Sequence, residues 1–246
     1  PVETDTRRTL KQNYSEFLPK FSVMYAFDEV RNLYVSVAKG YKSGGFNTQI
    51  FSDVLQQELM NKMGIGEVYD VRRGVTYKPE YSWNYELGGH FSCMDGVVRG
   101  DFALFYINVR DQQLTVFPPG KTTGRMMTNA GRTRSLGAEA ALQISPWRSL
   151  EINLAYGYTD ARFMKYETTV KDDAGNPIRI SYKDNRIPYA PQHTLSAHAA
   201  WTVATDVTWL GDVVLQAGVR CAGRIWWNEE NSLSQPLYAL ADASVR

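Results

Sequence analysis

The feature that most constrains this chain is an alternation of apolar and polar residues with a period of two, which recurs along its whole length. The run from Leu150 to Tyr158 is the clearest, because Leu, Ile, Leu, Tyr and Tyr alternate there with Glu, Asn, Ala and Gly. Successive side chains of a β-strand point to opposite faces, so such a run predicts a strand with one apolar and one polar face. Runs of this kind lie near 18–26, 33–38, 82–92, 97–109, 135–144, 150–158, 194–203, 212–222 and 238–246. The sequence therefore predicts an all-β protein of about nine strands, mostly of about 9–11 residues, which is long enough for a tilted strand to cross a bilayer.

The connections between these runs alternate in length. Short connections lie near 27–31, 93–97, 145–149 and 204–211, and long ones near 42–80, 110–133, 162–191 and 223–237. A transmembrane β-barrel shows this alternation, because its turns are short on the periplasmic side and its loops are long on the outer side. We therefore predict a segment of an antiparallel transmembrane β-barrel. Residues 51–63 are mildly helical in pattern and predict a short helix inside the first long loop.

Large aromatic residues fall at both ends of the predicted strands. Aromatic belts at the two membrane interfaces are typical of barrels that span a membrane. A soluble β-sandwich that binds a partner remains the alternative, and it would stay in solution without detergent. The two groups are Trp147, Trp201 and Trp209 near the short turns, and Trp83, Tyr85 and Tyr106 near the opposite rim.

Charge and cysteine content exclude several functions. The 27 Lys and Arg residues balance the 26 Asp and Glu residues, which leaves a formal charge of +1. A protein that follows nucleic-acid phosphates usually has a clear basic excess, so no nucleic-acid partner is predicted. The two cysteines, Cys93 and Cys221, are too few for a disulfide scaffold. The predicted topology puts them near opposite rims, so we predict that they do not pair.

Neither a metal site nor a catalytic site is indicated. The three histidines, His90, His193 and His198, do not have the spacing of metal ligands, and no cysteine lies near them. Ser196, His193 and Asp184 could form a triad only through the fold, and the chain has no GxSxG elbow. We therefore predict no catalytic residue, no metal, no cofactor and no enzyme activity.

Four segments resemble the β-barrel of TonB-dependent receptors, in particular the iron–siderophore group. They occur in the family's order and cover roughly residues 17–191. The segments are Asn32–Asn47 (NLYVSVAKGYKSGGFN) preceded by Phe17–Lys20, Tyr77–Glu80 followed by Asn84–Gly88, Asn129–Gly131 followed by Ser135–Glu139, and Arg186–Pro191.

The resemblance implies a receptor whose barrel has about 22 strands and encloses an N-terminal plug. Residues 1–246 would then be a C-terminal part of the barrel domain, without the plug, the TonB box or the closing strands. The implied function is active transport across the outer membrane, in which a ferric siderophore or a similar scarce nutrient is imported with energy from the TonB system. Receptors for cobalamin, haem or glycans, and a passive porin-like barrel, remain alternatives. The implied partners are the nutrient, the TonB system through the plug, and outer-membrane lipid and lipopolysaccharide.

The expected substrate contacts lie in the long loops. Basic side chains suit an anionic ferric chelate, because charge-assisted hydrogen bonds to arginine are strong and directional. For each residue the alternative is a solvated loop or a contact to lipopolysaccharide phosphate. On the polar face, Gly137 beside Glu139 would leave room for a neighbour inside the barrel. The expected contacts are Lys42, Asn47, Arg72, Arg73, Arg110, Arg134, Tyr166 and Tyr182.

Overall fold

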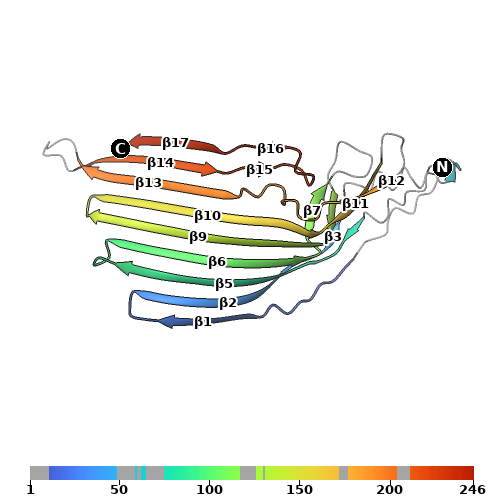
Figure 1. Ribbon diagram of the computed structural model, residues 1–246, viewed down its shortest axis with the longest axis horizontal. Helices are drawn as coiled ribbons and strands as arrows, with labels where there is room; N and C mark the ends of the chain where they lie inside the picture. The colour runs from blue at the N-terminus through green and yellow to red at the C-terminus, as the bar shows by residue number, and fades with distance from the viewer. Residues whose placement is uncertain are drawn as a thin grey trace.

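One antiparallel sheet of nine strands dominates the protein (Figure 1). The computed structural model describes residues 11–48, 59, 62–64, 75–116, 126–129, 131–171, 177–203 and 211–246. Neighbours in the sheet follow the order β1-β2-β5-β6-β9-β10-β13-β14-β17, so each long strand pairs with the next one along the chain. Their bounds are β1 Lys20–Ala26, β2 Arg31–Lys42, β5 Glu80–Cys93, β6 Val98–Arg110, β9 Arg132–Trp147, β10 Leu150–Lys165, β13 His193–Val203, β14 Val213–Ala222 and β17 Tyr238–Val245. The predicted all-β class and its strands are confirmed.

The connections separate into two ends of the sheet, as the sequence predicted. In Figure 1 the short turns lie at the left, which we call the turn end, and the long connections lie at the right, the loop end. Within the long connections, eight short strands pair two by two. These strands are β3 Gly45–Phe46 with β4 Thr76–Tyr77, β7 Gln113–Val116 with β8 Met126–Asn129, β11 Glu167–Lys171 with β12 Pro177–Ser181, and β15 Ile225–Trp226 with β16 Ser234–Gln235.

The predicted helix over 51–63 lies outside the described residues, apart from Leu59, Lys62 and Met63. In the described part of the chain, no helix is long and apolar enough to cross a membrane.

Strands β9 and β10 extend well beyond their apolar alternation. Each has 16 residues, whereas the alternation predicted 135–144 and 150–158. Main-chain pairing between them continues to Phe163 opposite Thr133 and Lys165 opposite Arg132. The backbone ladder therefore continues after the apolar side chains end, because pairing of N–H and C=O groups does not depend on side-chain polarity.

The register places the apolar and polar side chains on separate faces. Leu154 stands between Leu142 on β9 and Ala197 on β13, so its row is apolar. Asn153 stands between Gln143 and His198, so the adjacent row is polar. The face to which Leu154 belongs is called the apolar face below. Large side chains of this face are exposed in mid-strand, including Val35 (52%), Leu87 (41%) and Leu104 (51%).

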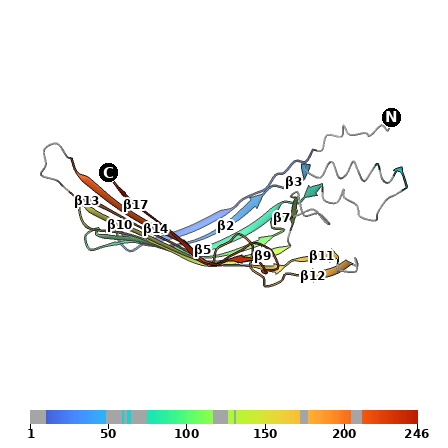
Figure 2. The same cartoon turned by 90° about the horizontal axis from the view of Figure 1, so that it is seen from above.

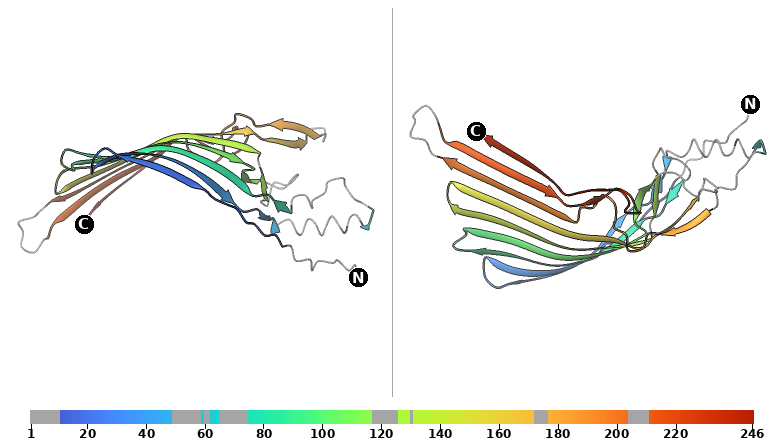
Figure 3. Two further views of the ribbon diagram at one scale, coloured as in Figure 1. Left: turned by 90° about the horizontal axis from the view of Figure 1, so that it is seen from below. Right: turned by 45° about the horizontal axis from the view of Figure 1, so that its top comes forward.

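The sheet is curved and open. Figures 2 and 3 show one bent, twisted layer, and its edge strands β1 and β17 do not pair with each other. A hollow on this layer is lined by side chains from Tyr34 on β2 across to Arg220 on β14. Strands so far apart in the sheet can line one hollow only on the inner side of its curve, so the polar face is the concave face.

The buried apolar side chains gather at the loop end rather than under the middle of the sheet. Ala161, Phe163, Tyr182 and Ile187 form this cluster, and Phe163 is completely buried. The middle of the sheet has no second layer among the described residues, so its apolar face needs an apolar surrounding.

The face assignment leads to a matched test on neighbouring residues of β10. We expect Leu154→Arg, made in the full receptor, to lower the folded yield in the outer membrane, because an arginine facing lipid near the bilayer midplane costs about 2–4 kcal/mol. Asn153→Arg should be tolerated, since position 153 faces the polar side, where Asn153 donates to Glu151 Oε1 at 2.8 Å. Heat-modifiable gel mobility and surface labelling measure the yield. Greater harm from Asn153→Arg would show that the faces are reversed.

Candidate functional site: the concave face and the loop end

The concave face carries a connected set of polar side chains. The Tyr34 hydroxyl donates to Glu86 Oε1 at 2.7 Å, and the Asn84 amide donates to Glu86 Oε2 at 3.4 Å. The Tyr34 ring stacks on His90 with the ring centroids 5.7 Å apart. His90 Nδ1 in turn contacts Asp101 Oδ1. These contacts bridge β2, β5 and β6, so the concave face is a preorganised polar surface that suits water or a polar partner.

Aromatic rings fill the space above two glycines of the concave face. A Cβ atom at Gly137 would lie 2.2 Å from Cζ of Phe105, and one at Gly88 would lie 2.4 Å from the Tyr34 hydroxyl. The room that Gly137 leaves on the concave face is occupied by the Phe105 ring of the adjacent strand.

At the loop end, side-chain amides join two of the long connections. Asn47 is 8% exposed, and its amide group makes two hydrogen bonds to the main chain of Met127: Nδ2 donates to the carbonyl at 2.8 Å, and Oδ1 accepts from the N–H at 2.7 Å. The Gln113 amide donates to the carbonyls of Ser43 at 2.8 Å and Lys78 at 3.1 Å. These bonds join the β3–β4 and β7–β8 hairpins, which are far apart in sequence, into one platform.

A third amide completes this platform. Asn129 Nδ2 donates to the carbonyls of Lys78 at 3.0 Å and Asp111 at 2.7 Å, while Asn129 Oδ1 accepts from the N–H of Lys78 at 2.8 Å. Glu80 Oε2 accepts from the N–H of Gln113 at 2.7 Å. Main-chain groups of these loops thus form hydrogen bonds with side chains where no regular sheet supplies a partner. These bonds give the loop end a defined shape.

The apolar cluster at the loop end includes two tyrosines whose rings are in contact. The Tyr166 ring lies 5.1 Å from Phe163 and 5.4 Å from Tyr182, measured between centroids. Burial, helped by the nearby negative charge of Glu229, raises the pKa of Tyr166 to about 12. Burial also raises the pKa of Tyr182, with Glu230 and Glu229 adding to the effect. Both phenols are therefore neutral and act as packing groups at physiological pH.

The structure distributes the expected substrate contacts over different environments. Among the expected contacts that the structure describes, Tyr166 and Tyr182 contact each other. Lys42 is exposed, and the register of β2 puts it on the concave side at the loop end, opposite Glu80. Asn47 is buried within the loop platform. Arg72 and Arg73 lie outside the described residues.

Arg110 and Arg134 occupy the other face of the sheet. Arg134 lies two residues from Leu136, and Arg110 lies four residues from Tyr106, so both share the apolar face of those residues. From residue type and loop position, Arg110 and Arg134 were expected to contact the same ligand as Lys42. The strand register instead places them on the face of the sheet opposite to that of Lys42. Reasoning from sequence also missed Gln113 and Asn129, whose hydrogen-bond partners include residues distant in the chain.

The register separates two members of the grouping of Ser196, His193 and Asp184. Ser196 lies on the concave face with His198, whereas His193 lies opposite Tyr158 on the apolar face. His193 Nδ1 is 2.8 Å from the Tyr156 hydroxyl. A serine and a histidine on opposite faces of a sheet cannot share a proton. In the part of the chain that the structure describes, no three His, Cys, Asp or Glu residues form a metal-binding group.

Cysteine and aromatic positions also follow the predicted topology. Cys93 ends β5 at the turn end, Cys221 lies near the loop end of β14, and both are free.

The predicted aromatic residues also lie toward the two ends of the strands. Tyr85 and Tyr106 are neighbours on the apolar face near the loop end, with ring centroids 6.3 Å apart. Trp201 lies toward the turn end on the same face. Trp209 lies outside the described residues.

Comparison with known proteins identifies the architecture. The family model described as TonB dependent receptor-like, beta-barrel matches residues 2–246. The chain belongs to this family. Members are outer-membrane transport receptors rather than enzymes.

Individual relatives support the same assignment. The pesticin receptor of Yersinia enterocolitica is 25% identical, and the match covers 96% of this chain and 29% of that receptor. The ferrioxamine receptor of the same species is 26% identical, and the match covers 92% of this chain and 25% of that receptor. The solved ferric yersiniabactin uptake receptor of Yersinia pestis has a TM-score of 0.65 at 22% identity, over 93% of this chain and 29% of that one. The ferric preacinetobactin receptor of Acinetobacter baumannii has a TM-score of 0.63 at 18% identity, and the match covers 98% of this chain and 31% of that one. The chain therefore spans less than a third of these relatives and has the fold of their barrels.

The amide platform can be tested at Gln113. We expect Gln113→Met to loosen the loop end by about 1–3 kcal/mol, because the carbonyls of Ser43 and Lys78 lose their shared donor. Hydrogen–deuterium exchange should accelerate in residues 43–48 and 126–129 while the long strands stay protected. Gln12→Met is the control, since Gln12 is exposed. Equal exchange in both variants would contradict the role of the platform.

The raised pKa of Tyr166 predicts a loss of stability in alkali. The folded pKa of about 12 exceeds the unfolded value near 10, so above pH 10 the unfolded chain loses a proton that the folded chain keeps. Stability should therefore fall between pH 10 and 12, and Tyr166→Phe should remove that part of the fall. The ultraviolet difference titration between wild type and variant should show a phenol that ionises near pH 12 when folded and near 10 in denaturant. A folded value near 10 would contradict the burial of this phenol.

Proposed function

We propose that this chain is part of an outer-membrane receptor that imports a ferric siderophore or a similar scarce nutrient with energy from the TonB system. The observation that carries the proposal is the family match over residues 2–246, together with relatives named as the ferrioxamine receptor and the pesticin receptor. The polar concave face and the shaped loop end are compatible with this function. Such a protein binds and releases its ligand without changing it chemically, so the chain would not act as an enzyme.

The two faces of the sheet have different tasks in this proposal. The apolar face would contact lipid, and the concave face with Tyr34, Glu86 and Asp101 would contact water and the plug through which TonB acts. The loop end would receive the nutrient from outside. A platform joined by Asn47 and Gln113 supports this task, because a rigid arrangement of loops lowers the entropy lost when a ligand is bound.

Among the expected contacts, Lys42 is the best candidate for a direct contact with the nutrient. It is exposed at the loop end, and its ammonium group suits an anionic ferric chelate. Arg72 and Arg73, from the same long connection, are proposed as further contacts on residue type alone. Asn47, Tyr166 and Tyr182 are proposed to support the ligand surface indirectly, by holding the loops.

Lys42 and Lys39 form a matched pair, because they lie on opposite faces of β2. In the full receptor, we expect Lys42→Gln to weaken binding of an anionic ferric chelate about tenfold, the loss expected when a charge-assisted hydrogen bond is removed. Lys39→Gln should leave binding unchanged, since Lys39 lies on the apolar face and contacts Glu16. Uptake of radioactive iron measures the effect, with a panel of ferric siderophores that includes ferrioxamine and ferric yersiniabactin.

The same assay tests the mechanism of transport. Uptake should disappear in a strain that lacks TonB. Uptake that persists without TonB would favour a passive porin-like barrel, and selective uptake of cobalamin, haem or a glycan would replace the siderophore as the nutrient. An equal loss in the Lys39 and Lys42 variants would remove Lys42 from the proposed site.

A further inference from the structure

The connection between β10 and β13 returns to the sheet along the extended end of β10. We call residues 182–192 the return segment. The N–H of Phe163 donates to the carbonyl of Asn185 at 3.0 Å, and the N–H of Ile187 donates to the carbonyl of Ala161 at 3.0 Å. These two bonds flank an antiparallel bridge between Arg162 and Arg186. The return segment is therefore fixed to a rigid strand although it is not a strand itself.

The main-chain groups of Arg186 point away from β10. In an antiparallel bridge whose hydrogen bonds come from the flanking residues, the N–H and C=O of the central residue face the opposite side. In a regular sheet the next strand would bind both groups. Here the side chain of Asn231 binds both, because its Oδ1 accepts from the N–H of Arg186 at 2.6 Å and its Nδ2 donates to the carbonyl at 2.9 Å. The amide of Asn231 thus replaces the peptide group of a strand.

A second asparagine makes the contact reciprocal. Asn231 belongs to the connection between β14 and β17 and binds the return segment. Asn185 belongs to the return segment, and its Nδ2 donates to the carbonyl of Glu229 at 2.8 Å in the β14–β17 connection. We call Asn185 and Asn231, with these three hydrogen bonds, the asparagine clip. The clip joins two long connections that the chain separates by about 40 residues.

The clip residue Asn231 is presented by a compact turn. Asn228 Oδ1 accepts from the N–H groups of Ser232 and Leu233, both at 3.1 Å, and the N–H of Asn231 donates to the carbonyl of Asn228 at 3.2 Å. Asn231 has φ 58°, a left-handed conformation that asparagine tolerates better than most residues. The amide is therefore held in position before it meets Arg186, so little freedom is lost in the contact.

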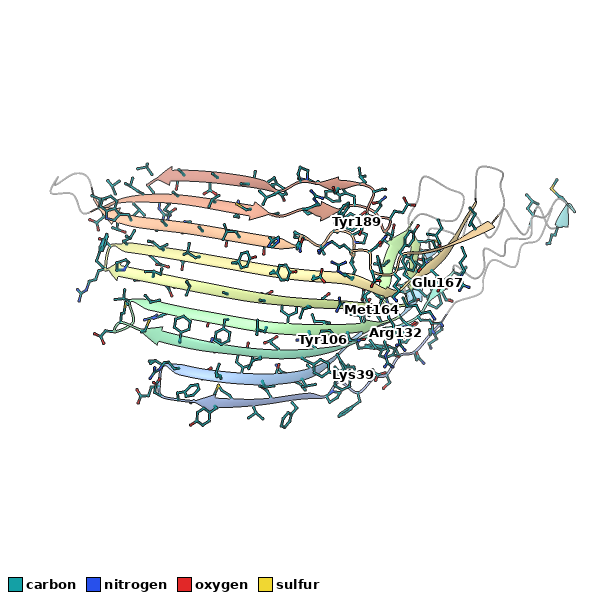
Figure 4. All side chains as sticks on the ribbon, in the orientation of Figure 1. Lys39, Tyr106, Arg132, Met164, Glu167 and Tyr189 are labelled. Atoms are coloured by element: carbon teal, nitrogen blue, oxygen red, sulfur yellow. The ribbon has the colours of Figure 1, made fainter. Side chains whose placement is uncertain are left out.

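The return segment also depends on the β14–β17 connection for its backbone conformation. Tyr189 has φ 65°, which a bulky side chain rarely adopts, and such a conformation persists only where the surroundings impose it. Its N–H donates to the carbonyl of Trp226 at 2.9 Å, and its ring centroid lies 5.6 Å from that of Trp227. Figure 4 labels Tyr189 at the loop end of the sheet. The two connections therefore fold as one unit.

We propose that Asn231 is a positioning residue for nutrient binding, because its amide fixes the β14–β17 connection on the return segment and makes the two connections one wall of the nutrient entrance. The proposal rests on the proposed function of the receptor. Asn231 acts in it through the shape of the entrance and not through a contact with the nutrient. Without the clip the arrangement that binds is less populated, and the apparent affinity falls by that fraction.

The first test measures the clip itself in the full receptor. Asn231→Gly removes the clip bonds of residue 231 and keeps its left-handed backbone, since glycine adopts this conformation freely. Hydrogen–deuterium exchange should become about tenfold faster in residues 184–190 and 226–233, while β10 and β13 stay protected. Asn13→Gly is the matched control, because Asn13 is exposed in the segment before β1, and its exchange should equal that of the wild type.

The second test measures the consequence for binding. Cells that lack TonB bind but do not import, so iron-55 supplied as ferric yersiniabactin and as ferrioxamine gives the dissociation constant and the number of sites. We expect Asn231→Gly to raise the dissociation constant about fivefold at an unchanged number of sites per folded receptor. Asn231→Asp keeps the acceptor for the N–H of Arg186 and loses the donor, so its dissociation constant should lie between the two. Heat-modifiable gel mobility counts the folded receptors.

Each result supports or overturns a stated part of the proposal. Unchanged exchange in Asn231→Gly would overturn the clip, and so would equal acceleration in Asn13→Gly. Faster exchange with an unchanged dissociation constant, or fewer sites as the only change, would overturn the positioning role. A folded wild-type receptor that binds neither ferric siderophore would contradict the proposed substrate, and the exchange measurement would still support or overturn the clip.

Discussion

Main-chain hydrogen bonding between neighbouring strands is the interaction on which the rest of the structure depends. An N–H or C=O group without a partner costs several kcal/mol in a bilayer, so a spanning sheet must pair its strands continuously. The same pairing fixes which side of the sheet each side chain occupies. Leu154 and Asn153 are neighbours in sequence, yet they belong to an apolar row and a polar row because β9 and β13 hold β10 in register. A slip of one residue would exchange the rows.

The ladder also shapes the loop end, where the apolar pattern has already stopped. β9 and β10 stay paired as far as Lys165 opposite Arg132, and this extension buries Phe163 on one side while it holds Arg162 on the other. Beyond the strands, amide side chains form hydrogen bonds with main-chain N–H and C=O groups, as Asn47 does with those of Met127. The loops therefore derive their shape from polar contacts anchored on rigid strands.

The strands could be predicted from the sequence because a period of two needs only local information. Their full length could not, since Arg132, Thr133 and Lys165 contribute to pairing without contributing to an apolar pattern. The expected contacts were chosen by residue type and loop position, and neither property shows on which face of the sheet a side chain lies. The face of Arg134 could have been predicted, because Arg134 lies two residues from Leu136 in the same strand. The structural role of Asn47 could not, because its hydrogen-bond partner Met127 is 80 residues away.

The charged residues of the apolar face also define how the sheet can sit in a membrane. An arginine on the outer surface of a barrel costs about 2–4 kcal/mol at the midplane and about 0–1 kcal/mol near the interfaces, so Arg134 must lie at or beyond one interface. Trp147, at the other end of the same strand, suits the opposite interface. The two residues are about 13 positions apart, which is about 44 Å along an extended strand at about 3.4 Å per residue. A tilt of about 45° reduces this to about 31 Å across the membrane, close to the hydrocarbon thickness of about 30 Å. Arg134 and Trp147 of β9 thus delimit a band of about the thickness of a bilayer.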